Sequence, residues 1–118
     1  MDQETLSMEE WEVIAFFGGD HVSREYGTDW YDSDSVYEVN YENGLKVTCA
    51  IHPIHKDVRV CIYQGGVKFF DWQGVSLKDI CYIEEKSRTL VKFISQSSDI
   101  MELEVQPKLS INFKSGEL

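Results

Sequence analysis

The first 45 residues of this 118-residue chain contain a single basic side chain, that of Arg24. The same segment holds twelve carboxylates, which give it a net charge of −11, whereas residues 46–118 carry a net charge of +1. A segment this negative repels nucleic acid and anionic membranes, so we expect neither as a partner. It attracts a cationic partner and accelerates the encounter with it. The uneven charge therefore predicts a protein that binds a basic partner.

Cysteine and long apolar runs are also scarce. An odd number of cysteines, each within an apolar segment (Cys49, Cys61 and Cys81), argues against a disulfide framework and favours free thiols in a reducing compartment. No segment approaches the ~20 apolar residues of a transmembrane helix, and the sequence starts with acidic residues where a secretory signal would be basic. We therefore expect a cytoplasmic protein.

The length and composition favour one folded domain over residues 1–118. Hydrophobic residues make up 42% of the chain and aromatic residues 13%, which suits a packed core despite the net charge of −10. No internal repeat or low-complexity segment divides the chain.

Residues 7–19 are predicted to form a helix. Ser7 followed by Glu10 matches a capping box, and Gly18-Gly19 matches a C-terminal cap. Apolar residues between them recur at helical spacing, namely Met8, Trp11, Ile14 and Ala15. A strand remains the alternative, because the residues from Trp11 to Phe17 also alternate.

Residues 36–113 predict an antiparallel β-meander of about eight strands. The expected strands are 36–42, 45–51, 58–63, 67–72, 80–84, 90–95, 100–105 and 109–113. Asn43-Gly44 predicts a type I′ hairpin turn, and Gln64-Gly65-Gly66 predicts a second hairpin. Short strands at this spacing favour a curled antiparallel sheet or an open barrel. The expected fold class is thus α+β, mainly β, with one N-terminal helix.

Residues 20–35 lack an apolar period and predict an acidic, aromatic loop. Rigid aromatic side chains are typical of interface hot spots, and carboxylates accept paired hydrogen bonds from arginine. The loop and the strand after it therefore supply the predicted partner-binding residues, which are Glu25, Asp29, Trp30, Tyr31, Asp32, Asp34, Glu38 and Glu42. The simpler alternative is that Trp30 and Tyr31 cover the core while the carboxylates are solvated.

Signals for metal binding and catalysis are weak. His52 and His55 are the best metal candidates, but Pro53 between them predicts an irregular connection and a closed site needs a further ligand. Asp32-x-Asp34 starts like an EF-hand loop but lacks the turn glycine. The sequence has neither a nucleophile elbow nor a P-loop, so we expect no enzyme activity and no cofactor.

Aromatic residues in the predicted strands leave a second function open. Phe69, Phe70, Trp72, Tyr82 and Phe93 are most simply core residues, but a curled sheet can also enclose a small apolar ligand. The alternative to a protein-binding inhibitor is therefore a small-molecule-binding, barrel-like module with a pocket around Phe69, Tyr82 and Phe93.

A small α+β domain with lopsided negative charge and an acidic, aromatic loop resembles the immunity proteins of bacterial contact-dependent growth inhibition and polymorphic toxin systems. The resemblance is one of size, charge and surface type over the whole chain. It implies an inhibitor that binds a cognate toxin domain and blocks its active site. Many such toxins are basic nucleases, so the resemblance also implies an acidic surface that mimics the charge of nucleic acid.

Overall fold

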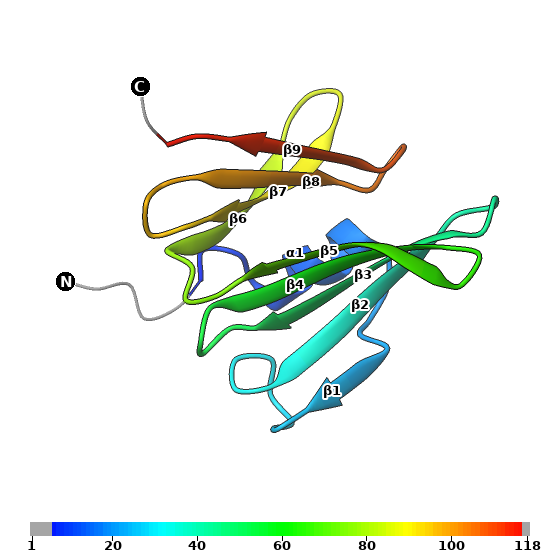
Figure 1. The fold of residues 1–118 in the computed structure, drawn as a ribbon. Helices are drawn as coiled ribbons and strands as arrows, with labels where there is room; N and C mark the ends of the chain where they lie inside the picture. Colours follow the sequence, from blue (N-terminus) through cyan, green and yellow to red (C-terminus); the bar gives the residue numbers. More distant parts are fainter. Residues whose placement is uncertain (1–5, 117–118) are drawn as a thin grey trace.

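A computed structural model describes residues 6–116, which form two antiparallel sheets and one short helix, α1 (Glu10–Phe17), between them (Figure 1). The five-stranded sheet contains β1 (Ser23–Glu25), β2 (Asp34–Asn40), β3 (Leu45–His52), β4 (Asp57–Gln64) and β5 (Val67–Gly74). The four-stranded sheet contains β6 (Asp79–Glu84), β7 (Thr89–Ile94), β8 (Ile100–Glu104) and β9 (Ser110–Lys114). Spatial order follows chain order in both sheets, so each is a meander. The predicted α+β, mainly β class is confirmed, and the described strands do not close into a barrel.

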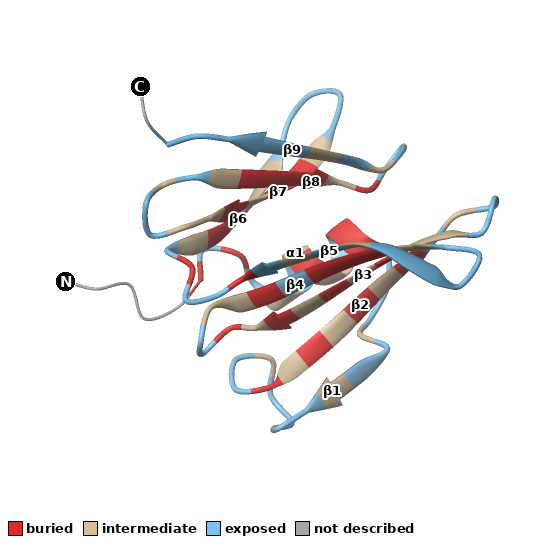
Figure 2. Ribbon diagram, viewed as in Figure 1, coloured by how far each residue is buried: buried red, intermediate tan, exposed pale blue. Residues whose placement is uncertain are grey.

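Alternation along the strands separates the core from the surface. Tyr37 and Val39 of β2 are buried, and their neighbours Glu38 and Asn40 face solvent. Buried residues of the two sheets and the helix belong to one hydrophobic cluster, and Figure 2 shows buried residues (red) in α1 and in strands of both sheets, while β5 and β9 are mostly exposed or intermediate. The three cysteines are free, as predicted.

Helix α1 is shorter than the predicted 7–19 and buries a different face. Glu9 is the N-cap and forms the capping box with Glu12, whereas Ser7 hydrogen-bonds Asp79 at the start of β6. Gly18 ends the helix with a positive φ of 78°, the conformation that glycine tolerates best. Val13, Phe16 and Phe17 are buried, while Trp11 is 62% exposed. No helix in residues 6–116 is long and apolar enough to cross a membrane.

The hairpin turns also differ in part from the prediction. At Asn43-Gly44 only the glycine has a positive φ (84°), and Tyr41 closes a three-residue loop by bonding Leu45. This is the geometry of a type I turn followed by a left-handed glycine, so the type I′ prediction is wrong there. The two consecutive positive φ values of a type I′ turn occur instead at Gly65 (56°) and Gly66 (84°).

The predicted loop 20–35 contains a strand that the sequence did not suggest. Ser23–Glu25 forms β1 and pairs with the first three residues of β2. The irregular connection is therefore shorter than expected, because β2 begins at Asp34. The nine observed strands comprise the eight predicted ones, with shifted ends, and this short edge strand.

Candidate functional site

The β1–β2 hairpin gathers carboxylates at one end of the five-stranded sheet. Glu25 lies directly opposite Asp34, and Asp29 and Asp32 are exposed in the loop that joins them. None of the ion pairs between described residues involves these four carboxylates. Like charges placed directly opposite on paired strands are destabilising. The hairpin therefore carries a negative charge that no ion pair between described residues compensates.

Arg24, the basic residue of this acidic segment, lies beneath the hairpin rather than on its surface. Its side chain is 15% exposed, and its guanidinium donates to Glu10 of α1 at 2.8 Å. It also donates to the hydroxyl of Ser35 at 2.7 Å and to the carbonyl of Thr28 at 3.2 Å. Burial alone would lower the pKa of Arg24, but the hydrogen bond with Glu10 raises it above its usual value. Arg24 thus ties α1, β1 and the loop together and leaves the surface carboxylates unpaired.

The aromatic residues of the loop have different roles. Trp30 is half-buried against the core, with its ring edge-on to Tyr37 at a centroid distance of 6.3 Å. Tyr31 is 36% exposed, and Tyr26, which the sequence reasoning did not single out, is 79% exposed. Tyr26 also has a positive φ of 72°, a strained backbone conformation for a non-glycine residue. Together with Glu25, Asp29, Asp32 and Asp34, the two tyrosines form a surface that we call the acidic end.

Gly27 explains how this loop folds so tightly. A Cβ atom at this position would lie 2.5 Å from a carboxylate oxygen of Asp32. A larger residue here would displace the Asp32 side chain and would also crowd the Asp32 carbonyl oxygen, which would lie 3.1 Å from the added Cβ. This tight fold holds Asp32 close to the backbone that follows Tyr26. A tyrosine directly before a glycine in a polar segment is the sequence signal that could have indicated this exposed aromatic residue.

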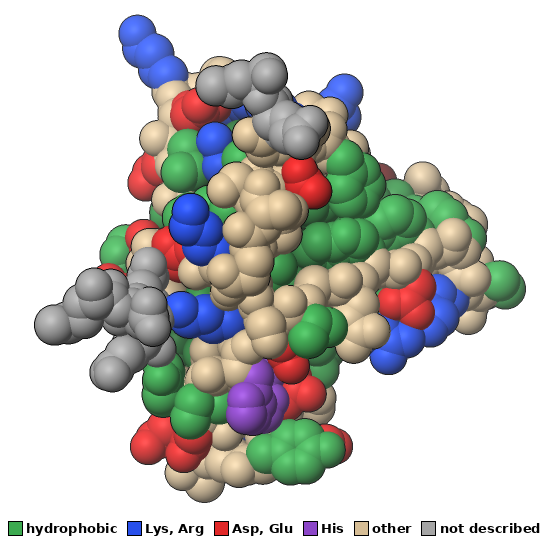
Figure 3. Space-filling model, turned by 60° about the vertical axis from the view of Figure 1, so that its left-hand side comes forward, with side chains coloured by type: hydrophobic (Ala, Val, Ile, Leu, Met, Phe, Trp, Pro, Cys, Tyr) green, Lys and Arg blue, Asp and Glu red, His purple; other side chains and the backbone are tan. Residues whose placement is uncertain are grey.

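The two predicted metal candidates lie beside the acidic end. His52 stacks on Tyr26 with a centroid distance of 6.1 Å and an interplanar angle of 3°, and His55 packs edge-on to His52 at 4.5 Å. No group of three potential metal ligands occurs among residues 6–116. Near the foot of the face shown in Figure 3, histidine side chains (purple) adjoin acidic (red) and hydrophobic (green) ones. The geometry thus makes the histidines part of an aromatic stack.

Two of the predicted carboxylates lie apart from this cluster. Glu38, in the middle of β2, is 3.9 Å from Lys46 and accepts a hydrogen bond from Asn40. Glu42 lies beyond the opposite end of β2, eight residues from Asp34, which corresponds to about 26 Å along an extended strand. The structure therefore brings together Glu25, Asp29, Asp32 and Asp34, but not Glu38 and Glu42.

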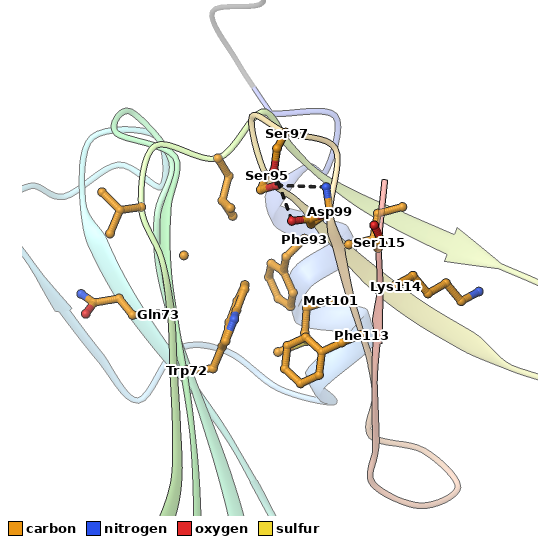
Figure 4. A pocket seen from close by; sticks show the side chains of 14 residues that line it. Trp72, Gln73, Phe93, Ser95, Ser97, Asp99, Met101, Phe113, Lys114 and Ser115 are labelled. Carbon is orange, nitrogen blue, oxygen red and sulfur yellow. Dashed lines mark hydrogen bonds between the residues drawn. The ribbon is translucent and has the colours of Figure 1, made fainter. Parts of the chain in front are cut away.

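A second surface feature is a cleft between the two sheets, lined by apolar residues and by the polar residues Gln73, Ser95, Ser97, Asp99, Lys114 and Ser115. Its volume is about 600 Å³, and Trp72 of β5, Phe93 of β7, and Met101 and Phe113 of β8 and β9 point into it (Figure 4). Phe113 is 57% exposed, so the cleft is open to solvent. Of the pocket residues expected for a small-molecule module, Phe93 lines this cleft, whereas Phe69 and Tyr82 do not.

Comparison with known proteins shows where this fold occurs. No protein-family model matches the chain, and no curated protein matches it in sequence. A solved structure does match: a chain of the "Contact-dependent growth inhibition toxin - immunity protein complex from Klebsiella pneumoniae 342", with a TM-score of 0.82. The two chains share this fold. The match covers 95% of this chain and 97% of the other at 13% sequence identity.

The resemblance predicted from charge and size is therefore confirmed at the level of the fold. At 13% identity the match carries no individual side chain from one protein to the other. The acidic end and the cleft consequently have to be interpreted from this chain's own residues.

Proposed function

We propose that this chain is an immunity protein that binds a cognate toxin domain and blocks it without catalysing a reaction. The observation that carries the proposal is the acidic end, where four carboxylates without a paired cation surround two exposed tyrosines. The fold supports the same assignment, because the solved relative belongs to a toxin–immunity protein complex. The strongly acidic charge favours the inhibitor rather than the toxin of such a pair.

The chemistry of the acidic end favours a cationic partner. Asp29, Asp32 and Asp34 would pair with arginine or lysine side chains, and Glu25 with the more distant Glu38 and Glu42 would extend the attractive field. Tyr31 and Tyr26 offer rigid contact area, while Trp30 supports the loop from below and presents its exposed edge. A basic toxin domain fits this surface, and a nuclease fits it best because its active site already attracts an anion.

Co-expression provides the direct test. The probe is the toxin domain encoded beside this chain's gene, produced in a sensitive host with and without the chain. We expect the chain to restore growth and to form a 1:1 complex with the purified toxin domain. Growth arrest that persists despite soluble chain would contradict the proposal.

The surface is tested by neutralising its charge. Asp29→Asn combined with Asp32→Asn and Asp34→Asn should slow association by about tenfold at low salt and weaken its dependence on ionic strength. The matched control removes three carboxylates from the far sheet, with Glu84→Gln, Glu85→Gln and Glu104→Gln. Equal effects of the two triple variants would show that net charge, not the acidic end, attracts the partner.

The aromatic contribution appears in the dissociation rate. Tyr31→Ala should accelerate dissociation by about tenfold or more if the ring is buried in the complex. Val22→Ala, at another exposed apolar residue, is the control. An unchanged dissociation rate for Tyr31→Ala would remove Tyr31 from the interface.

A further inference from the structure

We propose that the cleft between β5 and β9 receives an extended, apolar segment of the partner protein, which adds a strand to β5 and inserts a large apolar side chain between the sheets. This inference rests on the proposed function only for the identity of the protein that supplies the segment. The site is separate from the acidic end, because β1 and β5 are the two opposite edges of the five-stranded sheet.

The lining of the cleft selects an apolar side chain. Trp72 and Phe113 approach each other from opposite sheets, with ring centroids 6.4 Å apart, and Phe93 lies 5.6 Å from Trp72 at its base (Figure 4). Met101 adds a flexible thioether. Figure 3 shows a broad band of hydrophobic side chains in the hollow on this side of the molecule. A volume of about 600 Å³ exceeds what a single aromatic side chain fills, so part of a main chain fits as well.

The two rims of the cleft favour a polypeptide over a small molecule as the ligand. Within residues 6–116, β5 pairs with β4 alone and β9 pairs with β8 alone, so both rims are sheet edges. Edge strands present unpaired N–H and C=O groups at the spacing that another extended chain matches. Val67 and Phe69 of β5 are also 68% and 62% exposed, and they lie on the same strand as the ion pair between Lys68 and Asp71.

The two charged side chains at the rim differ in their partners. Lys114 points to Glu102 on the outer face of the sheet, at 3.3 Å. Asp99 accepts hydrogen bonds from Ser97 and Gly116 but takes part in none of the ion pairs between described residues. An entering acidic residue would meet this carboxylate and would also lose its hydration. The segment is therefore expected to carry no acidic residue where it crosses the cleft.

The cleft and the acidic end are distinct sites, but a row of hydrogen-bonded loops links them. The amide of Ile54 in the β3–β4 turn donates to the carbonyl of Tyr31, and the carbonyl of Lys56 in the same turn accepts from Leu77 in the β5–β6 linker. Exposed apolar side chains follow this row: Ile54 is 45% exposed and Val75 is 63% exposed. One partner seated on this end of the molecule would cover both surfaces, with cations on the acidic end and an apolar segment in the cleft.

A designed peptide tests the cleft without the toxin. The probe is the neutral peptide acetyl-Thr-Val-Thr-Phe-Thr-Val-Thr-amide, added to the full chain labelled for NMR. We expect at least tenfold slower hydrogen exchange at the β5 amides that point away from β4, and a shift of the Trp72 indole N–H signal. The control peptide replaces both valines with proline, which removes two donors and prevents strand pairing but keeps the phenylalanine.

Single-residue variants test whether the peptide binds in the cleft. Phe113→Ser, at a largely exposed position where folding is expected to persist, should weaken peptide binding about tenfold, and Val22→Ser far from the cleft should leave it unchanged. Absence of exchange protection at β5 would overturn the proposal, as would equal binding of the proline peptide. A homodimer of the free chain that Phe113→Ser dissociates would assign the cleft to a second copy and also overturn it.

The test of the cleft and the test of the proposed function can fail independently of each other. Neutralising Asp29, Asp32 and Asp34 should leave peptide binding unchanged, since the peptide carries no charge. Failure to protect against the toxin together with intact peptide binding would reject the immunity role alone. Protection against the toxin that survives Phe113→Ser with unchanged toxin affinity would reject the cleft as part of the interface.

Discussion

Two surfaces of this protein carry carboxylates in opposite settings. At the acidic end, Glu25 and Asp34 face each other across a strand pair without a cation within ion-pairing distance among the described residues. On the outer face of the four-stranded sheet, Glu102 lies 3.7 Å from Lys92 and 3.3 Å from Lys114. The residue type is the same, but the charge is compensated on only one of the two surfaces.

The difference shows which carboxylates serve the fold. Paired carboxylates such as Glu102, which is 6% exposed, need their cations because burial removes their hydration. Exposed unpaired carboxylates gain nothing from the fold and repel one another. Stability does not account for their grouping at one end of the sheet, whereas the proposed binding of a cationic partner does. Mutations at the two surfaces should therefore have effects of opposite sign.

The largest effect is expected beneath the acidic end. Arg24→Met should lower the free energy of unfolding by about 3 kcal/mol, because it removes three hydrogen bonds from a largely buried guanidinium, to Glu10, Ser35 and the carbonyl of Thr28. Its counterpart on the other sheet is Arg88→Met, which breaks exposed pairs with Glu85 and Glu104 and should cost below about 1 kcal/mol. Urea unfolding measures both. Equal losses would mean that Arg24 is no more structural than a surface arginine.

The pH dependence of stability tests the burial of Tyr37. Burial raises the pKa of Tyr37 to about 12, whereas an unfolded tyrosine has a pKa of about 10. The folded state therefore keeps this proton between pH 10 and 12 where the unfolded state loses it, so stability is fully present below pH 10 and falls as the pH rises. The loss amounts to about 2 kcal/mol by pH 12. Tyr37→Phe should reduce the decline over this range, and an unchanged slope would refute the assignment.

An intermediate effect is expected at the compensated surface. Glu102→Gln should lower the free energy of unfolding by about 1 kcal/mol, because Lys92 and Lys114 are then left close together without their shared counter-charge. Thermal unfolding at low and high salt measures it. A stabilising effect would show that Glu102 is retained for something other than the fold.

The smallest expected effect is an increase in the free energy of unfolding. Glu25→Gln combined with Asp34→Asn should stabilise the chain by about 0.5 kcal/mol at low salt, because it removes a like-charge pair on adjacent strands. The gain should shrink as salt screens the repulsion. Urea unfolding at two salt concentrations checks this, and destabilisation would give these carboxylates a structural role.

Most strands could be predicted because their signals are local. All eight predicted strands are present with ends within two residues of those observed, since alternation and turn glycines act over a few residues. The three polar residues of β1 have no such pattern and form a strand because β2 lies beside them. Ser7 has the chemistry of a helix cap, yet Asp79, 72 residues away, takes both of its donors.

The candidate site was predictable in composition but not in arrangement. The segment rich in carboxylates contains the acidic end, as expected. Which of these carboxylates lie close together depends on the topology. Glu25 lies opposite Asp34 because β1 folds back on β2, whereas Glu42 lies beyond the far end of β2. Trp30 looked like an exposed anchor but packs half-buried against the core, since only the tertiary structure shows that the core has room beside Tyr37.

The sequence by itself determined the fold class, the strand order along the chain, the location of the negative charge and the absence of disulfides. These properties depend on residue periods, turn chemistry and composition, which act locally. Only the tertiary structure decided which carboxylates share a surface, that Arg24 is buried beneath them, and that β5 and β9 leave a cleft between two sheet edges. Those features arise from contacts between segments far apart in the chain, which no local pattern encodes.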